Sequence, residues 1–206
     1  MSLAGRLLTF FPAFVIACAA GTVAAMIVTR SPLWLVALFF CIYGLPLLTF
    51  RAIDRIRPLH EGRSYLDGPR YSPWWGSHNI QRIYIAFPQI ESLLQLIPGA
   101  FSLWLRLWGS RIGRRVYWTP RVEIADRSLL DVGDDVVFAH KVECYAHAIK
   151  PGRRGRLVLF VRRIRIGSRV FLGAGTRIGP GVRVGDDTLV PILSDIYISK
   201  RMEAAP

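Results

Sequence analysis

The C-terminal part of the chain repeats with a period of six residues. From residue 166 onward an aliphatic side chain stands at every sixth position, and glycine follows the first four: Ile166, Leu172, Ile178, Val184 and Val190. The fifth position of each unit is small or branched: Val170, Thr176, Val182, Thr188 and Ser194. An α-helix repeats a face every 3.6 residues and a β-strand every two, so neither has this period. A fixed short period is typical of a solenoid, in which each unit buries its apolar edge against its neighbours.

Six residues are enough for one short strand and one corner. Glycine suits a corner because it adopts positive φ without steric cost. Three such strands complete one turn of a parallel β-helix. The first and fifth positions of each unit then point inward, and the other positions face solvent. The repeat therefore predicts a mainly β domain.

The same frame is present further upstream. Its first positions there are Ile112, Trp118 and Ile124, followed after a two-residue slip by Val132, Phe138 and Cys144. The frame is lost from Ile149 to about Leu159, where the basic stretch PGRRGR lies, and it resumes at Phe160. We expect the coil to run from Ile112 to about Ile198, interrupted by one basic loop. Residues 112–200 are assigned to this domain and residues 201–206 to a tail.

Two long segments without charged residues precede the repeat. Leu7–Thr29 contains 23 residues and Ser31–Phe50 contains 20. At ~1.5 Å per residue, a helix of either length spans roughly 30 Å, the hydrocarbon thickness of a bilayer. We expect a transmembrane helical hairpin over residues 1–57. Buried core helices are the alternative, and a cleaved signal peptide fits poorly because a second apolar segment follows at once.

The basic residues around this hairpin predict its orientation. Arg6 precedes the first segment and Arg51, Arg55 and Arg57 follow the second, whereas Arg30 alone marks the turn. Cytoplasmic loops are enriched in Lys and Arg, so both ends of the hairpin and the repeat domain are expected in the cytoplasm, attached to the cell (inner) membrane. The formal net charge of +13 suits contact with anionic membrane lipids. No nucleic-acid-binding fold is recognisable, so no nucleic acid partner is expected.

Residues 58–111 connect the hairpin to the repeat. They contain the aromatic stretch YSPWWGSHNIQRIYIAF and then FPQIESLLQLIPGAFSLWLRLWGSRIG, which predicts a helix interrupted near Pro98. This helix is apolar nearly all round. Trp104, Arg106 and Trp108 near its end are residue types that favour the lipid headgroup region. We expect an interfacial helix lying along the membrane; a helix packed on the first coils is an equally good alternative.

Candidate catalytic groups are few, because the chain has only four histidines. Two lie in the repeat, where His140 is third and His147 fourth in its unit, so neither is needed for core packing. His147 stands immediately before the frame is lost. A surface imidazole beside a long insertion is well placed to act as general base toward a bound hydroxyl or amine. The alternative is that both are ordinary solvent-facing histidines.

The repeat resembles a known enzyme family. VGDDVVFAHKVECYAHAI followed by RIRIGSRVFLGAGTRIGPGVRVGDDTLV is similar to the hexapeptide-repeat acyltransferases, whose fold is a left-handed β-helix, and to their sugar O-acetyltransferases in particular. This resemblance covers about residues 129–200. The apolar segments and the Leu-Trp helix also resemble membrane-bound members, among them the C-terminal domains of poly-ε-lysine synthetases.

The resemblance implies a homotrimer with active sites between its subunits. It also implies transfer of an acyl group from acetyl-CoA or another acyl-CoA, or from an acyl carrier protein, without a covalent acyl-enzyme. His147 matches the position of the catalytic base that takes the proton of the acceptor. His140 lies one repeat unit earlier and would orient that base or line the acceptor site.

The family pattern also implies residues that bind the acyl donor. Backbone N–H groups around Gly173 and Gly175 would hold the thioester carbonyl. Phe171 stands where the family usually has tryptophan and would form an apolar wall. Lys200 and Arg201 match basic residues that bind donor phosphates.

Several features depart from that pattern. His147-Ala148-Ile149 lacks the second polar residue that often follows the catalytic histidine, and Glu143 is only a weak candidate to orient the imidazole. Cys144 occupies an inward position and is interpreted as a core residue rather than a nucleophile. Two histidines in the coil are too few for a zinc site of the γ-carbonic anhydrase kind. We therefore expect no bound metal and no permanently bound cofactor.

These observations predict a membrane-bound acyltransferase that acts on a hydroxyl or an amine. Membrane attachment favours an acceptor that is itself membrane-associated: a lipid-linked glycan, a lipid, a peptide or a pigment. The alternative is a non-catalytic trimeric scaffold that recruits partners to the membrane.

Overall fold

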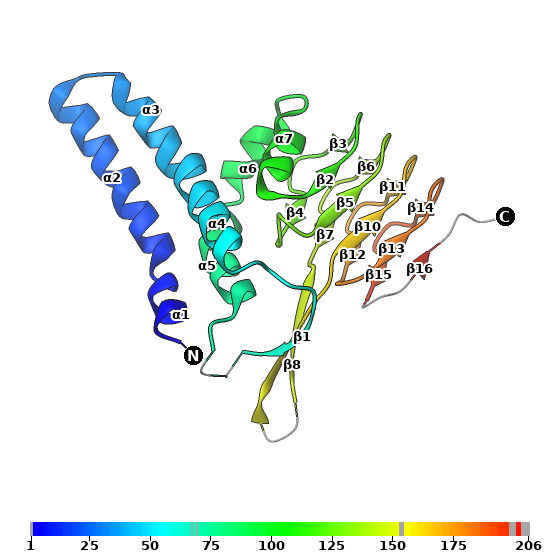
Figure 1. Ribbon diagram of the computed structural model, residues 1–206. Helices are drawn as coiled ribbons and strands as arrows, with labels where there is room; N and C mark the ends of the chain where they lie inside the picture. Colours follow the sequence, from blue (N-terminus) through cyan, green and yellow to red (C-terminus); the bar gives the residue numbers. More distant parts are fainter. Residues whose placement is uncertain (1, 67, 69, 153–154, 198–200, 203–206) are drawn as a thin grey trace. The chain divides into compact units, whose positions relative to one another are not determined.

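The computed structural model describes residues 2–66, 68, 70–152, 155–197 and 201–202. These residues divide into two compact units (Figure 1). The helical unit comprises residues 1–60 and 68–83, and the coil unit comprises residues 61–67 and 84–206. Each unit is described by itself.

The helical unit is built around an antiparallel pair of helices. Its elements are α1 (Leu3–Leu8), α2 (Phe11–Thr29), α3 (Leu33–Phe39), the π-helical turn η1 (Phe40–Gly44), α4 (Leu45–Ile56) and the first part of α5 (Pro73–Ala86). Arg30 closes α2 in the left-handed conformation, with φ of 53°. Pro46 follows the π-helical turn. Proline has no backbone N–H to donate to the carbonyl one turn earlier in an α-helix.

Two continuous helices in this unit are long and apolar enough to cross a membrane. They are Phe11–Thr29 and Leu33–Ile56, each with a mean hydropathy of 2.2 over its most apolar 18-residue window. Only 6% of the first window and 11% of the second are buried. That exposure argues against the alternative of buried core helices, because a soluble core would cover these side chains.

The coil unit is a parallel solenoid with three faces. The first sheet contains β2 (Arg111–Ile112), β5 (Leu130–Val132), β10 (Ile164–Ile166), β13 (Arg183–Val184) and β16 (Arg201–Met202). The second contains β3 (Tyr117–Trp118), β6 (Val137–Phe138), β11 (Phe171–Leu172) and β14 (Leu189–Val190). The third contains β4 (Glu123–Ile124), β7 (Glu143–Cys144), β12 (Arg177–Ile178) and β15 (Asp195–Ile196). Consecutive strands visit the three sheets in turn, which confirms the predicted coil; its left hand stays a prediction.

The outward side chains give each face a distinct character. Strand register aligns Arg111, Asp131, Arg165, Arg183 and Arg201 in one row, which we call the basic face. The apolar face carries Tyr117, Val137, Phe171 and Leu189. The acidic face carries Glu123, Glu143, Arg177 and Asp195. Along the chain each coil passes from the basic to the apolar to the acidic face.

The inward positions of the repeat form the core. Twelve first-position side chains of the coil are buried: Ile112, Trp118, Ile124, Val132, Phe138, Cys144, Ile166, Leu172, Ile178, Val184, Val190 and Ile196. Trp118 stacks on Phe138 of the next coil, with ring centroids 4.1 Å apart. Burial raises the pKa of the Cys144 thiol, so this cysteine is a core residue and a poor nucleophile.

The glycines of the repeat serve a different purpose from the one predicted. The left-handed corner residue is the fourth of each unit, and it is usually not glycine, as at Arg169 and Asp187. Where the second position is glycine, as at Gly133 and Gly173, the next coil lies too close for a side chain. A Cβ at Gly133 would lie 2.7 Å from the backbone of Gly167, and one at Gly173 would lie 2.5 Å from the backbone nitrogen of Ile192.

The predicted basic loop is a β-hairpin. Strands β8 (His147–Pro151) and β9 (Leu157–Val161) pair antiparallel, and β1 (Gly62–Tyr65) adds to the other edge of β9 (Figure 1). The coil therefore leaves its path at His147 and returns at β10. The expected resumption of the frame at Phe160 is wrong, because Phe160 pairs with Ala148 in the hairpin and is only half-buried. A segment from before the coil, β1, is part of the same small sheet.

Two short helices cover the first coil. They are α6 (Gln89–Gln95) and α7 (Ala100–Trp108). The indole N–H of Trp118 donates to Ser102 Oγ at 2.8 Å, and the Arg106 guanidinium donates to the carbonyls of Ile112 and Gly113. The structure therefore favours the packed alternative for the inner side of α7.

The expected headgroup placement of the two tryptophans is wrong. Trp104 and Trp108 are buried, because the indole rings pack against each other and against Tyr84. The other side of these helices does expose apolar side chains: Leu93, Leu96, Ile97, Leu103 and Leu107. Contact of that side with a membrane stays a prediction.

The close stacking of coils generates a test. Gly133→Ala should lower the free energy of unfolding by roughly 1–3 kcal/mol, because its Cβ would overlap backbone atoms that cannot move away. Thermal unfolding of the purified chain measures the effect. Gly21→Ala is the matched control, because no atom lies within 4 Å of its added Cβ. Equal melting temperatures for the two variants would contradict the packing explanation.

Candidate active site

The structure places His147 at the corner between the acidic and basic faces. It is the fourth residue of the unit that starts at Cys144, the position at which other units turn left-handed. Here the chain begins strand β8 instead. The imidazole therefore stands outside the coil core, with 17% of its side chain exposed.

A carboxylate holds this imidazole. His147 Nδ1 lies 2.7 Å from Asp126 Oδ2. The same carboxylate oxygen accepts the backbone N–H of Ala146 at 2.9 Å. Asp126 is 4% exposed, so water competes little for the contact. Two donors on one buried oxygen fix the position of both side chains.

The sequence prediction did not identify Asp126. Asp126 lies one coil before the histidine, and the spacing of 21 residues matches no regular repeat, because the two-residue slip falls between them. The slip itself is the signal that was available. The slip begins at Arg127 and the hairpin begins at His147, and each of these is the fourth residue of its unit. Successive coils therefore depart from the repeat at the same corner.

A buried ion pair holds the slip in place. The Arg127 guanidinium donates to both oxygens of Glu91, at 2.6 Å from Nε and 2.5 Å from Nη2. Trp104 donates to the same carboxylate at 2.8 Å, and the Tyr84 ring lies 4.9 Å from the guanidinium carbon. Arg127 is fully buried, so the partner charge is essential. Helix α6 thereby fixes the residue next to Asp126.

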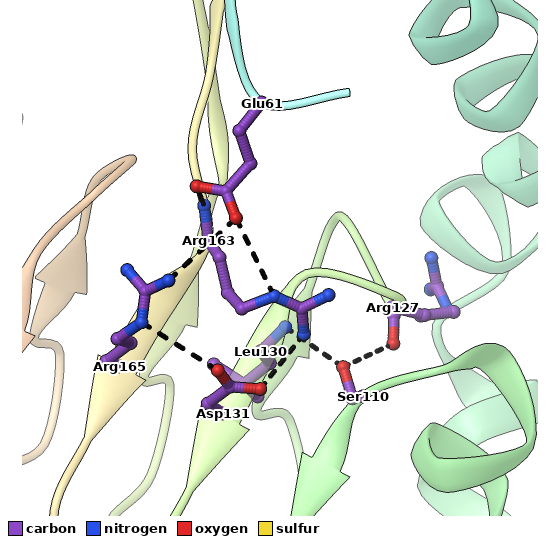
Figure 2. A network of polar contacts seen from close by, with 7 residues as sticks. All are labelled: Glu61, Ser110, Arg127, Leu130, Asp131, Arg163 and Arg165. Carbon is purple, nitrogen blue, oxygen red and sulfur yellow. Dashed lines mark hydrogen bonds and ion pairs between the residues drawn. The ribbon is translucent and has the colours of Figure 1, made fainter. Parts of the chain in front are cut away.

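A serine hydroxyl completes this corner. Ser110 Oγ donates to the carbonyl of Arg127 at 2.7 Å and accepts the N–H of Leu130 at 3.0 Å (Figure 2). The backbone on both sides of the slip is therefore tied to the residue that precedes the first coil.

Glu143 has a different partner from the one considered in the sequence. The Tyr145 hydroxyl donates to Glu143 Oε2 at 2.9 Å. Burial and then the charge of Glu123 raise the pKa of Tyr145, so the phenol stays protonated. Burial and the neighbouring Glu143 also raise the pKa of Glu123. The Tyr145 ring lies 6.5 Å from the imidazole, edge-on, and forms one wall beside it.

The structure places His140 at another corner. It lies between the apolar and acidic faces, where its Nδ1 is 3.2 Å from the carbonyl of Pro120. Asp126 rather than His140 orients His147. The His140 carbonyl accepts the N–H of Gly175, so this histidine lies beside the glycines predicted for the donor.

The predicted donor residues lie on different faces of the coil in a single chain. Phe171 is in the outward row of the apolar face, and Arg201 is in the row of the basic face. Lys200 lies outside the described residues. The N–H of Gly173 donates to Val190, and that of Gly175 donates to His140, so both are engaged within the coil. Among the described residues, the Ala174 N–H between them donates to no acceptor.

Metal-ligand clusters were also considered. Within the described ranges, no group of three or more His, Cys, Asp or Glu side chains is placed to hold a metal ion.

Comparisons with known proteins give the following similarities. No family model matches the sequence, and no curated protein matches it. The structure is similar to a hexapeptide-repeat acetyltransferase from Vibrio cholerae O1 biovar eltor solved with acetyl coenzyme A, at 16% identity over 61% of this chain and 85% of that chain, with a TM-score of 0.40. It is also similar to a galactoside acetyltransferase in complex with coenzyme A, at 17% identity over 57% and 76% of the two chains, with a TM-score of 0.38.

A maltose O-acetyltransferase from Clostridium difficile 630 gives a further similarity, at 15% identity over 56% of this chain and 74% of that chain, with a TM-score of 0.35. The structural neighbours are thus hexapeptide-repeat and sugar acetyltransferases, the kind of protein that the sequence resembles. At TM-scores of 0.40 and below, none of them decides what this chain binds or transfers.

The buried ion pair generates a second test. Arg127→Met should destabilise the coil unit by roughly 3–5 kcal/mol, because it leaves the Glu91 charge buried without a partner. The double variant Glu91→Gln with Arg127→Met should recover part of that loss. Chemical denaturation of the wild-type protein, the two single variants and the double variant measures the coupling. Additive losses would show that the two side chains act independently.

Proposed function

We propose that the chain is a membrane-bound acyltransferase that uses His147 as general base. The single observation that carries the proposal is the contact between His147 Nδ1 and the buried Asp126 carboxylate at a solvent-accessible corner of the coil. A surface histidine that only contributes to solubility does not require a buried carboxylate partner. A general base requires one, because it must present one defined nitrogen to the substrate.

The geometry suits proton transfer at the outer nitrogen. An ionised carboxylate only accepts hydrogen bonds, so Nδ1 carries the hydrogen and Nε2 keeps its lone pair. Nε2 takes the proton of the acceptor hydroxyl or amine as that atom attacks the thioester carbonyl. The tetrahedral intermediate then expels the CoA thiolate, which leaves with the proton. Asp126 stabilises the imidazolium that exists between the two proton transfers.

The donor is acetyl-CoA or another acyl thioester. The Ala174 N–H, held between two glycines whose own N–H groups are engaged, is the donor we assign to the thioester oxygen. A fixed backbone N–H at this position stabilises the developing oxyanion. Phe171 supplies an apolar surface beside it.

Two copies of the chain are needed to complete the site. His147 lies at the acidic-to-basic corner and Phe171 on the apolar face, so one coil presents them in different directions. The apolar face exposes Tyr117, Phe171 and Leu189, with Leu189 70% exposed. A row of this kind favours burial against another copy. A closed trimer would bring the apolar face of one left-handed coil to the histidine corner of its neighbour.

Membrane attachment restricts the acceptor. The two apolar helices hold the chain at the inner membrane, with the coil on the cytoplasmic side. The acceptor is therefore a lipid, or a glycan, peptide or pigment carried at the membrane surface. The exposed leucines of α6 and α7 are compatible with this placement.

The catalytic assignment is tested by CoA release. Protein in membranes is supplied with acetyl-CoA and lipid extract, and free thiol is measured. His147→Ala should lower the rate on the order of 10²- to 10⁴-fold, since it removes the base. Asp126→Asn should lower kcat by up to about 10⁴-fold, because the imidazole loses its fixed tautomer and orientation.

His60→Ala is the matched control, because His60 is exposed and lies outside the coil unit. It should release CoA at the unaltered rate. A wild-type protein that binds no CoA and releases none would instead support the non-catalytic scaffold. Full activity in His147→Ala would contradict the assignment of the base.

The oligomer is tested by charge on the apolar face. Leu189→Asp should dissociate the trimer and abolish CoA release, because a carboxylate cannot be buried there without a partner. Light scattering on protein in detergent measures the mass. Leu93→Asp, a comparably exposed position on helix α6, is the control and should stay trimeric. A wild-type monomer with full activity would contradict the shared site.

A further inference from the structure

The basic face stacks arginines directly on one another. Strand register places Arg165 beside Arg183 and Arg183 beside Arg201 on three successive coils. Neighbouring strands lie about 4.8 Å apart, so the three side chains start from a line roughly 10 Å long. Like charges at facing positions of a sheet destabilise it. Repulsion between adjacent guanidinium groups therefore opposes folding at Arg183, and a bound anion would relieve it.

Three other surface arginines of the coil each pair with a carboxylate on the next coil. Arg115 pairs with Asp135 on the next coil, 20 residues later, through two hydrogen bonds. Arg169 pairs in the same way with Asp187, 18 residues later. Arg177 pairs with Asp195, again 18 residues later. At each of these positions the next coil supplies a carboxylate, whereas on the basic face it supplies another arginine.

The start of the row is already neutralised. Asp131 accepts from Arg163 Nη1 at 3.0 Å and lies 3.9 Å from Arg165 Nε (Figure 2). Glu61, next to strand β1, lies 3.9 Å from both guanidinium groups (Figure 2). These carboxylates hold Arg165 in place and close one end of the row. Arg183, in its middle, has no carboxylate partner among the residues that the structure describes.

The row lines a hollow on the coil surface. The hollow has a volume of about 480 Å³, and its walls include Arg165, Arg183 and Arg201 together with the backbone of Gly167 and Gly185. Glycines there leave the floor open between the side chains. Planar guanidinium groups match the oxygens of phosphate through paired hydrogen bonds. Several such groups in one line suit two linked phosphates better than a single carboxylate.

We propose that Arg165, Arg183 and Arg201 form a binding site for a phosphate or pyrophosphate group. This inference rests on the proposed function, because the row borders the corner that carries His147. A phosphate bound there belongs to one of two sources: a membrane acceptor with a phosphorylated headgroup, or the phosphates of the CoA donor. Phe171 and Ala174, assigned to the thioester, lie on other sides of the same coil but reach the histidine corner of a neighbouring copy in the proposed trimer, so a titration with CoA is needed to distinguish the two sources.

The test is a titration of the full-length protein, purified in detergent, with inorganic pyrophosphate. Arg183→Gln should weaken pyrophosphate binding by about tenfold, because it removes a charge-assisted pair of hydrogen bonds. Arg177→Gln removes the same charge from a carboxylate-paired position on the acidic face and is the matched control. It should change the affinity by less than about twofold.

A parallel titration with CoA identifies the source of the phosphate. If Arg183→Gln weakens pyrophosphate binding and leaves CoA binding intact, the site serves the acceptor. If it weakens both to the same extent, the site serves the donor. Equal losses in Arg177→Gln and Arg183→Gln, or a wild-type protein that does not bind pyrophosphate, would overturn the site.

Failure of this inference is distinguishable from failure of the proposed function. Binding is measured without turnover, and His147→Ala should bind pyrophosphate as the wild-type protein does. Absence of pyrophosphate binding in a protein that still releases CoA would remove the phosphate site and leave acyl transfer standing. The opposite result would retain an anion-binding coil without catalysis.

Discussion

The close stacking of one coil on the next is the constraint on which the rest of the structure depends. First-position side chains fill the interior, and second-position glycines let neighbouring backbones approach until no side chain fits between them. A coil this tightly repeated has few places where a functional group can be held in a defined position. Departures from the repeat provide those places, and both departures described here occur at the acidic-to-basic corner. The slip contributes Asp126 and the hairpin contributes His147.

Much of the fold follows from the sequence because the repeat is local. A period of six fixes which side chains point inward, and outside the hairpin the structure buries the first positions from Ile112 to Ile196. The role of the glycines was misjudged, because a clash between coils depends on residues 18 or more positions away. The surroundings of Trp104 and Trp108 were misjudged for a related reason. Composition alone does not distinguish a tryptophan in a headgroup layer from one packed over the end of a coil.

The candidate site was predictable only in part. His147 was recognisable because it precedes the break in the frame. Asp126 was not, because its contact joins two coils across an irregular spacing. The same holds for the Glu91–Arg127 pair, which joins a helix to the slip over 36 residues. Interactions that cross between repeats at a departure have no periodic signature, so the chemistry of the corner becomes visible only in three dimensions.

The proposed site combines His147 at the acidic-to-basic corner with the row of arginines on the adjoining basic face, and the Ala174 N–H reaches it from a neighbouring copy of the chain. The central claim is that this corner moves an acyl group to an acceptor in the membrane. The most direct measurement supplies membranes containing the protein with acetyl-CoA labelled in its acetyl group and follows the label into material extracted by organic solvent. The account predicts label in that fraction with the wild-type protein and almost none with His147→Ala. Equal labelling by the two proteins, or none by either while CoA binds, would contradict it.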